Sequence, residues 1–303
     1  MSEFNYNKLS EYLKKKYGKR TLKICIDGGF TCPNRDGTKG VDGCIFCSQR
    51  GAGDHLNVKP IKEQVKDYFA SYKAELVDSF IVYFQNYSNT YAKVDELKKK
   101  YDEALIDDRI KVLDIATRAD CIDEDICKLL ASYKEKRFDV WVELGLQTSN
   151  DKIGDLLNRK YTTCDVTNAV KLLNQYGLDC ILHIMVGLPN EKEEDIINTV
   201  KYLNTLNYQG LKIHSTYVVD GTKLKELYKD GLYKPLELDY YLKQVGYILS
   251  NINRNVVIHK LTGDSPKELL LAPKWNKHKT KLMNEIHKNL RENKIVQGMN
   301  YIV

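Results

Sequence analysis

The sequence predicts an α/β fold in which a partial (β/α)6 barrel is followed by a small C-terminal α/β extension. Two observations predict it. Over residues 1–220, β-like apolar runs alternate with segments of helical periodicity, and the pattern changes over residues 221–303. Repeated βα units form a parallel sheet covered by helices, and six of them can curl into a partial barrel with its active site at the carboxyl ends of the strands. An open, doubly wound sheet is the alternative.

The expected strands of the barrel are short apolar runs separated by helical segments. They are Thr21–Asp27, Ser79–Phe84, Lys111–Ala116, Asp139–Gly145, Asp179–Val186 and Leu211–Val218. A glycine-rich loop, residues 28–50, follows the first strand. Beyond residue 220 we expect a helix at Glu237–Asn251, a strand at Val256–Leu261 and a helix at Lys277–Asn293, packed on the barrel as an extension.

Composition favours a folded protein away from membranes. The 303 residues are 43% hydrophobic and 29% charged, which is enough for a real core. No apolar run approaches the roughly 18 residues that cross a bilayer, and the first twenty residues lack the apolar middle of a signal peptide. We therefore expect a cytoplasmic protein whose eight cysteines are reduced thiols or metal ligands.

Three cysteines in the glycine-rich loop form the pattern C-x11-C-x2-C. Cys32, Cys44 and Cys47 are too few for a closed structural zinc site, which takes four ligands. Three thiolates can hold a 4Fe-4S cluster and leave one iron open. The loop follows the first strand, so it should open at the catalytic end of the barrel. Zinc with a distant fourth ligand, such as Cys25 or His55, remains the alternative.

Basic residues cluster near both ends of the chain, whose formal net charge is +6. The clusters consist of Lys14, Lys15, Lys16, Lys19 and Arg20 near the start and Lys274, Lys277, Lys279 and Lys281 near the end. Such runs can track a phosphate backbone. A solvated lysine-rich face is the alternative interpretation.

Several longer motifs follow one another along the chain: GGFTCPNRDGTKGVDGCIFC, FQNYSNTYA, IATRADC, VWVELGLQT, GLPNE and HKLTGDSPKELLLAPKW. In these motifs the chain resembles the radical SAM family of bacterial YhcC and YtqA (MnmL-like), which is related to the radical SAM domain of the elongator catalytic subunit. The resemblance implies a partial (β/α)6 radical SAM barrel with one 4Fe-4S cluster on Cys32, Cys44 and Cys47. It also implies reductive cleavage of S-adenosylmethionine (SAM) to a 5′-deoxyadenosyl radical.

The resemblance further implies a set of SAM contacts. These residues are Phe46, Gln85, Arg118, Glu143, Gln147, Arg159 and Met185. Phe46 and Met185 would lie near adenine, although core packing is the alternative for both. Arg159 offers a planar fork for the SAM carboxylate, and Glu143 would hold Arg159 or a ribose hydroxyl. No catalytic residue beyond the cluster and SAM is expected, since the sequence shows no obvious paired carboxylates.

For the substrate, the resemblance implies the wobble uridine of tRNA, with conversion of 5-carboxymethylaminomethyluridine to 5-aminomethyluridine. The implied partners are tRNA and an electron donor such as flavodoxin or ferredoxin. Lys160, Tyr161 and residues 215–219 depart from the family's pattern and are candidates for an altered substrate pocket. Two alternatives stay open: a radical SAM enzyme acting on a small molecule or protein, and a zinc-stabilised nucleic-acid-binding protein.

Overall fold

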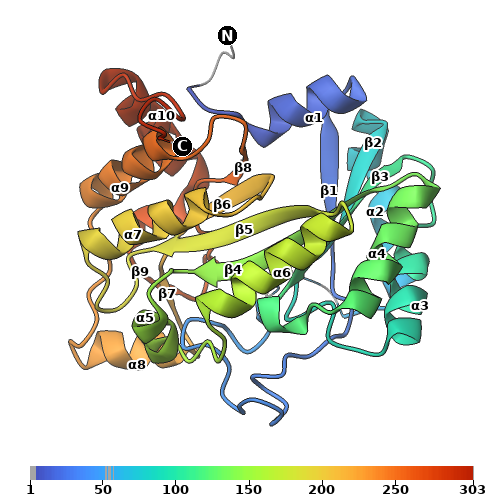
Figure 1. Cartoon of the computed structure of the whole chain (residues 1–303), viewed down its shortest axis with the longest axis horizontal. Helices are drawn as coiled ribbons and strands as arrows, with labels where there is room; N and C mark the ends of the chain where they lie inside the picture. Colours follow the sequence, from blue (N-terminus) through green and yellow to red (C-terminus); the bar gives the residue numbers. More distant parts are fainter. Residues whose placement is uncertain (1–4, 52, 54–55, 57, 303) are drawn as a thin grey trace.

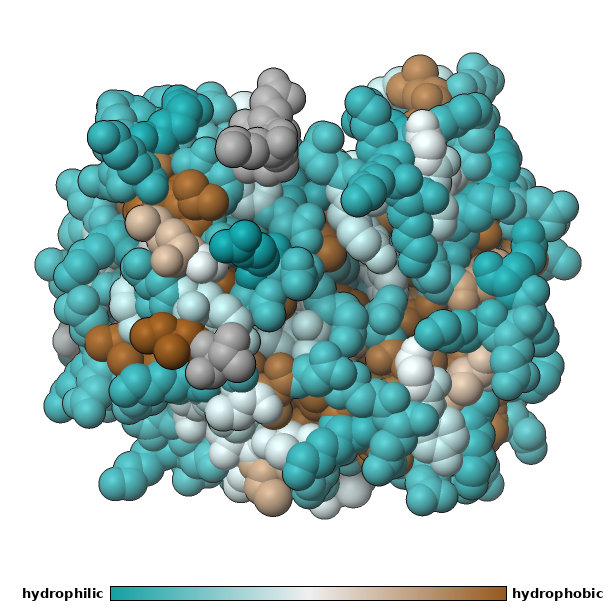
Figure 2. Space-filling model, turned by 45° about the horizontal axis from the view of Figure 1, so that its top comes forward, coloured by the Kyte–Doolittle hydropathy of each residue, from teal (hydrophilic) through white to brown (hydrophobic). Residues whose placement is uncertain are grey.

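The computed structural model describes residues 5–51, 53, 56 and 58–302, which form a large parallel sheet wrapped by helices and a small antiparallel sheet (Figure 1). His55, the possible zinc ligand, lies outside the described residues. Among the residues that are described, no helix is long and apolar enough to cross a bilayer. The face seen in Figure 2 is mostly hydrophilic, with its hydrophobic residues in small separate patches.

The strands are β1 (Thr21–Ile26), β2 (Ser79–Phe84), β3 (Ile110–Thr117), β4 (Asp139–Gln147), β5 (Asp179–Val186), β6 (Gly210–Ser215), β7 (Val218–Val219), β8 (Val257–Lys260) and β9 (Leu270–Ala272). In the described part of the chain, β1 to β6 and then β8 form one sheet in that order, and every neighbouring pair is parallel. The short β7 pairs antiparallel with β9. The sequential order excludes the doubly wound alternative, in which the strand order reverses.

The α-helices are α1 (Leu9–Tyr17), α2 (Ile61–Phe69), α3 (Val94–Ala104), α4 (Glu124–Lys136), α5 (Asp151–Leu156), α6 (Thr163–Gln175), α7 (Glu193–Asn204), α8 (Lys223–Lys229), α9 (Leu238–Asn251) and α10 (Lys279–Glu292). Short 3-10 turns are η1 (Tyr72–Leu76), η2 (Ala119–Cys121) and η3 (Lys274–Lys277). Local sequence sets several ends. Asp123 caps α4 by accepting from the Ile126 N–H at 2.9 Å, and Thr162 and Asp165 form a capping box at α6.

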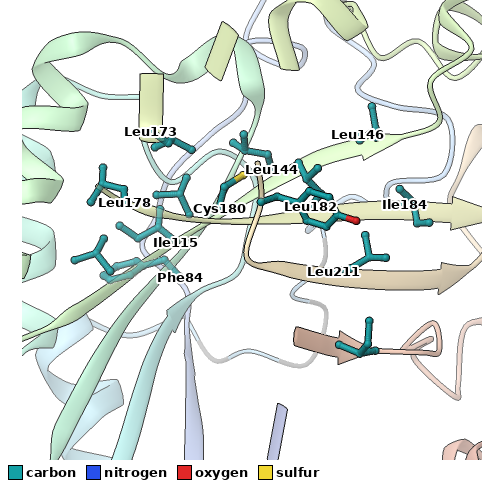
Figure 3. Close-up of a cluster of buried hydrophobic side chains, with 14 of the residues drawn as sticks. Phe84, Ile115, Leu144, Leu146, Leu173, Leu178, Cys180, Leu182, Ile184 and Leu211 are labelled. Carbon is teal, nitrogen blue, oxygen red and sulfur yellow. The ribbon is translucent and has the colours of Figure 1, made fainter. Parts of the chain in front are cut away.

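Both faces of the large sheet are buried, so apolar side chains alternate between an outer and an inner layer along each strand. The outer layer packs against the helices. Figure 3 shows part of it, with side chains from β2 to β6 meeting α6: Phe84, Ile115, Leu144, Cys180, Leu182, Leu211 and Leu173. The inner layer is apolar at the amino ends of the strands, where Ile81, Val112, Trp141 and Ile181 form a separate cluster.

Helix α1 closes the amino end of the barrel. Its Leu13 is buried in the same cluster as Trp141, and the Tyr17 hydroxyl donates to Asp139 at the start of β4. The residues before α1 run beside the last strand, where the Ile258 N–H donates to the Asn7 carbonyl at 2.8 Å. In Figure 1, α1 therefore lies at the opposite end of β1 from the loop that follows this strand.

The predicted α/β barrel is confirmed, and the sheet has one strand more than predicted. The segment expected as the strand of the extension is β8, which pairs with β6 and so belongs to the main sheet. The sixth strand ends at Ser215 and not at Val218, because the Ser215 hydroxyl bonds Asn276 at 2.8 Å and the Gly263 N–H at 3.0 Å as the chain leaves the sheet. A domain boundary at residue 220 stays a prediction.

Candidate radical SAM site

The three-cysteine loop leaves the carboxyl end of β1 and crosses the mouth of the barrel. In Figure 1 it is the blue trace at the bottom, far from α1. The Ile45 N–H donates to the Leu157 carbonyl at 3.1 Å, and the Leu224 N–H donates to the Ile45 carbonyl at 2.9 Å. The loop is therefore fixed to the segments around α5 and α8, on the far side of the mouth from β1.

The three thiols share one environment. All are free and partly buried. Cys32 Sγ lies 4.0 Å from Arg118 Nη1, and Cys44 Sγ lies 3.9 Å from Asn34 Nδ2. Burial raises the pKa of Cys44 to about 12; the neighbouring Cys47 and Cys32 raise it as well, while Arg118 opposes them. The sulfur atoms are thus near enough to repel one another as thiolates, with a guanidinium beside them.

Side-chain amides lock the loop in place. The buried Asn34 donates through Nδ2 to the Asn158 carbonyl at 2.6 Å, and Asn158 donates through its own Nδ2 to the Gly43 carbonyl at 2.7 Å. Arg35 donates through Nη2 to the Ser48 carbonyl at 2.6 Å. These bonds hold the backbone on both sides of Cys44 and Cys47 without using the thiols.

The loop fits an iron-sulfur cluster by the chemistry of its donors. Within the described residues, no three His, Cys, Asp or Glu side chains are already arranged around a metal position, so small side-chain rotations would have to bring the thiols together. Three thiolates on one loop are the ligand set that leaves one iron of a 4Fe-4S cluster open. Cys32, Cys44 and Cys47 would hold the cluster, and SAM would bind at the open iron.

Gln147 ends β4 at the rim with its backbone in the left-handed region, at φ 60°. Such a conformation is costly for a residue with a side chain and often marks a functional site. Its Oε1 lies 3.3 Å from the hydroxyl of Tyr161, which donates to the Gly145 carbonyl at 2.6 Å. A Cβ on Gly145 would lie 2.3 Å from Gln147 Nε2. Glycine at 145 therefore allows Gln147 to fold back over the strand.

Arg159, expected to meet the SAM carboxylate, is buried with its guanidinium engaged by the protein. Its Nη1 donates to the carbonyls of Leu146 at 2.5 Å and Thr148 at 2.9 Å. Its Nε donates to the Tyr161 carbonyl at 2.9 Å, and its Nη2 donates to Asp151 at 2.6 Å. These bonds hold the start of α5 against the end of β4. Contact between Arg159 and SAM stays a prediction, and the observed bonds give this arginine a structural role.

Arg118 lies closer to the cysteines. It makes a bidentate pair with Asp120, with both distances 2.8 Å, and its guanidinium stacks 4.7 Å from the Tyr161 ring centre. Lys39 of the cysteine loop also meets Asp120, at 2.6 Å. Asp120 therefore ties the loop to the segment after β3 and keeps Arg118 beside Cys32.

The remaining expected contacts surround the same mouth. Phe46 and Met185 pack against one hydrophobic cluster, which includes Ile45 and Leu188. Gln85 follows β2, and its N–H donates to the Ile26 carbonyl at the end of β1. The structure thus brings these residues together at the rim, while their contacts with SAM stay predictions.

A buried layer of ionisable side chains crosses the barrel between the apolar amino end and the rim. Glu143 Oε2 accepts from Lys212 Nζ at 2.5 Å and lies 2.9 Å from His183 Nε2. Lys23 Nζ donates to Asp114 Oδ2 at 2.6 Å and lies 3.7 Å from Glu143 Oε1. These five residues sit in the middle of β1, β3, β4, β5 and β6. We call them the ionic layer.

The ionic layer corrects two expectations. Glu143 was expected to hold Arg159 or a ribose hydroxyl, but it lies in mid-strand and pairs with Lys212. The acid partner of Arg159 is Asp151. The sequence shows no obvious paired carboxylates, but in the structure the Asp114 and Glu143 carboxylates both lie against Lys23.

Burial and neighbouring charges set the protonation of this layer. Burial raises the pKa of Asp114 to about 7, and the charge of Glu143 adds to this rise. Burial alone would also raise the pKa of Glu143, but Lys212 and Lys23 hold it well below its usual value. Burial lowers the pKa of Lys212 to about 8 and that of His183 to about 4. Glu143 is thus charged and His183 neutral at physiological pH.

A signal for this layer was present in the sequence. A charged residue inside an apolar strand needs a buried partner, because an isolated charge in the interior is very costly. Five predicted strands carry an ionisable residue between apolar ones, namely Lys23, Asp114, Glu143, His183 and Lys212 in TLKICI, KVLDIA, VWVELG, CILHIM and LKIH. Taken together, these interruptions indicate one shared polar layer.

The ionic layer makes a prediction for stability. Lys212→Met should lower the free energy of unfolding by about 3–5 kcal/mol, because it leaves the buried Glu143 carboxylate without its closest cation. The double variant Lys212→Met/Glu143→Met should recover most of that loss, as measured by urea unfolding. If the two substitutions lower the free energy of unfolding additively, the two side chains do not stabilise each other.

The cysteine loop makes a second prediction. After anaerobic reconstitution the wild-type chain should take up about four irons, and Cys32→Ala, Cys44→Ala or Cys47→Ala should abolish stable uptake. The exposed Cys164 is the matched control, and Cys164→Ala should bind iron as the wild type does. One tightly held zinc and no iron uptake, measured by elemental analysis, would favour the zinc alternative.

Comparison with known proteins agrees with this site. The chain is 34% identical to the Bacillus subtilis (strain 168) protein YtqA over 302 residues, which cover 98% of this chain and 93% of that protein. It is 28% identical over 167 residues to a tRNA uridine(34) acetyltransferase of Methanocaldococcus jannaschii, covering 54% of this chain and 30% of the acetyltransferase.

The fold recurs in the structure of an N-terminally truncated Elp3 of Methanocaldococcus infernus. The TM-score is 0.70 at 18% identity, and the match covers 91% of this chain and 64% of that one. The model of the Radical SAM superfamily matches residues 31–203, and that of the Radical_SAM C-terminal domain matches residues 208–292. Because the first model spans more than half of the 303 residues, the chain belongs to the radical SAM superfamily, whose cofactors are SAM and a 4Fe-4S cluster.

Proposed function

We propose that this radical SAM enzyme modifies the wobble uridine of tRNA, converting 5-carboxymethylaminomethyluridine to 5-aminomethyluridine. The observation that carries the proposal is the partial match to a tRNA uridine(34) acetyltransferase, which points to the wobble uridine. The particular reaction is the one that the resemblance to the MnmL-like family implies. When bound, the cluster and SAM would supply a 5′-deoxyadenosyl radical that removes a hydrogen atom from the methylene group between the amine and the carboxylate. Return of one electron from the substrate radical to the cluster, followed by hydrolysis of the resulting imine, would break the C–N bond and release the two-carbon fragment as glyoxylate. A flavodoxin or ferredoxin is the expected electron donor.

The protein's own residues close one end of the barrel and surround the entrance at the other. The apolar cluster under α1 closes the barrel at its amino end, so the substrate side chain must enter past the cysteine loop. Gln147, Arg118, Phe46 and Met185 surround that entrance and are the proposed SAM contacts. The ionic layer below them offers charged groups to a polar substrate.

The basic segment at residues 274–281 is the proposed tRNA contact. Lys277 and Lys281 are exposed. Their neighbour Lys279 pairs with Asp264, which also pairs with Lys260 at the carboxyl end of β8. The start of α10 therefore lies near the carboxyl end of β8. The basic residues of α1 lie at the closed end, so they are poorer candidates.

The assignment of SAM contacts can be tested by two variants. Gln147→Ala should weaken SAM binding about tenfold with little change in thermal stability, because it removes a polar contact at the rim. Arg159→Lys should lower the melting temperature, because a lysine cannot replace the planar fork that bonds Leu146, Thr148 and Asp151. The SAM affinity of the folded variant then shows whether Arg159 also contacts SAM. Equilibrium dialysis without reductant measures binding. Normal stability with lost SAM affinity in Arg159→Lys would assign Arg159 to SAM.

Phosphate contact by the basic segment predicts a change in salt dependence. Lys277→Gln/Lys281→Gln should weaken tRNA binding and reduce the slope of log affinity against log salt by about 1 to 2. Lys98→Gln/Lys128→Gln removes two exposed lysines of α3 and α4 and should leave the slope unchanged. A slope unaltered by the first pair would make those lysines an ordinary solvated surface.

The substrate prediction is the most direct. Reconstituted enzyme with SAM, dithionite and tRNA bearing 5-carboxymethylaminomethyluridine should yield 5-aminomethyluridine and a matching amount of 5′-deoxyadenosine, as measured by mass spectrometry of nucleosides. The Cys44→Ala variant is the control and should form neither. If wild-type enzyme leaves this tRNA unchanged and the tRNA does not stimulate SAM cleavage, a small-molecule or protein substrate becomes the better hypothesis.

A further inference from the structure

The barrel wall formed by β5, β6 and β8 is unusually rich in basic side chains. His183 of β5 is the register partner of Lys212 of β6, which in turn is the register partner of Lys260 of β8. His214 lies two residues after Lys212, and its ring centre is 5.2 Å from that of His183. We call these four residues the basic wall.

The lysines on this side of the barrel share their carboxylates unequally. Lys23 and Lys212 pair with Asp114 and Glu143, at 2.6 and 2.5 Å. Asp264 is shared by two lysines, Lys260 at 2.7 Å and Lys279 at 3.0 Å. Lys260 therefore shares its carboxylate with a second lysine, whereas Lys23 and Lys212 each lie against a carboxylate within the barrel.

His214 is the member of the basic wall nearest the cysteine loop. Its register partner is Met185, which packs on the same hydrophobic cluster as Phe46. His214 Nε2 is buried and has no hydrogen-bond partner among the described residues. An unpartnered buried nitrogen is costly, so a group that is absent from the structure is expected to meet it.

The chemistry of such a group follows from its surroundings. Burial holds the pKa of His214 well below its usual value, and the nearby charge of Lys260 lowers it further. The imidazole is therefore neutral and can donate one hydrogen bond. Burial lowers the pKa of Lys260, while Asp264, 2.7 Å away, opposes this and favours its ammonium form. A small anion is the ligand that such a neutral donor and ammonium fit best.

We propose that His214 and Lys260 bind the carboxylate of the substrate's C5 side chain, just above the ionic layer. This inference rests on the proposed function, because 5-carboxymethylaminomethyluridine is the substrate that supplies the carboxylate. Access agrees with it, since the apolar cluster with Trp141 and Leu13 closes the barrel from below. The carboxylate would reach the basic wall only through the mouth, which places the adjoining methylene group nearer the cysteine loop.

The test compares two anticodon stem-loops that differ only at the end of the C5 side chain. One carries 5-carboxymethylaminomethyluridine and the other its neutral carboxamide. Binding to the reconstituted enzyme is measured by fluorescence anisotropy without reductant. Wild-type enzyme should bind the carboxylate about tenfold more tightly than the amide, as expected for a hydrogen bond to a charged group. Lys260→Gln and His214→Phe should each reduce this preference to about twofold or less.

Lys243→Gln is the matched control, because Lys243 is an exposed lysine that pairs with Glu193 outside the barrel. It should keep the full preference. His214→Phe keeps a ring but removes the donor, and it carries the test if Lys260→Gln fails to fold, as judged by thermal unfolding. A preference that survives in both barrel variants would overturn the proposal.

The same two RNAs separate this inference from the proposed function. If wild-type enzyme binds both equally but the carboxylate RNA still stimulates formation of 5′-deoxyadenosine, the proposed function stands and the carboxylate site is wrong. If neither RNA binds nor stimulates SAM cleavage, the proposed function fails, and the carboxylate site fails with it.

Discussion

The ion pair between Lys212 and Glu143 is the constraint on which the rest of the structure depends. Both side chains are buried in mid-strand, so each is stable only if the other is present and correctly placed. Glu143 also meets His183 and Lys23, and its pairing therefore relates four strands of one sheet. A slip of one residue in any of these strands would turn an ionisable side chain toward the apolar outer layer.

The ionic layer also separates the apolar amino end of the barrel from the polar rim. Below it, the apolar cluster under α1 fills the inside of the barrel. Above it, the rim gathers the groups that a cofactor and substrate need. The rim is held by amide bonds from Asn34 and Asn158 and by the carboxylate of Asp120. Its residues are thus held in position by neighbouring side chains, as preorganised sites require.

The sequence predicted the strands, the cysteine loop and the family well, because each leaves a local pattern. Contacts that form only when the chain folds leave no local pattern, so the sequence did not show that Asp151 and the Leu146 carbonyl hold Arg159. The ionic layer was missed for the same reason, since each charge looked like an isolated exception in an apolar strand. The placement of β8 beside β6 likewise depends on contacts across the barrel.

The central claim is that a hydrogen atom is removed from the C5 side chain of a wobble uridine held over the ionic layer. The most direct measurement uses tRNA whose 5-carboxymethylaminomethyluridine carries deuterium on the methylene group between the amine and the carboxylate. With SAM and reductant, we predict that one deuterium appears in 5′-deoxyadenosine, as detected by mass spectrometry. Formation of 5-aminomethyluridine without deuterium in 5′-deoxyadenosine would contradict this placement of the substrate.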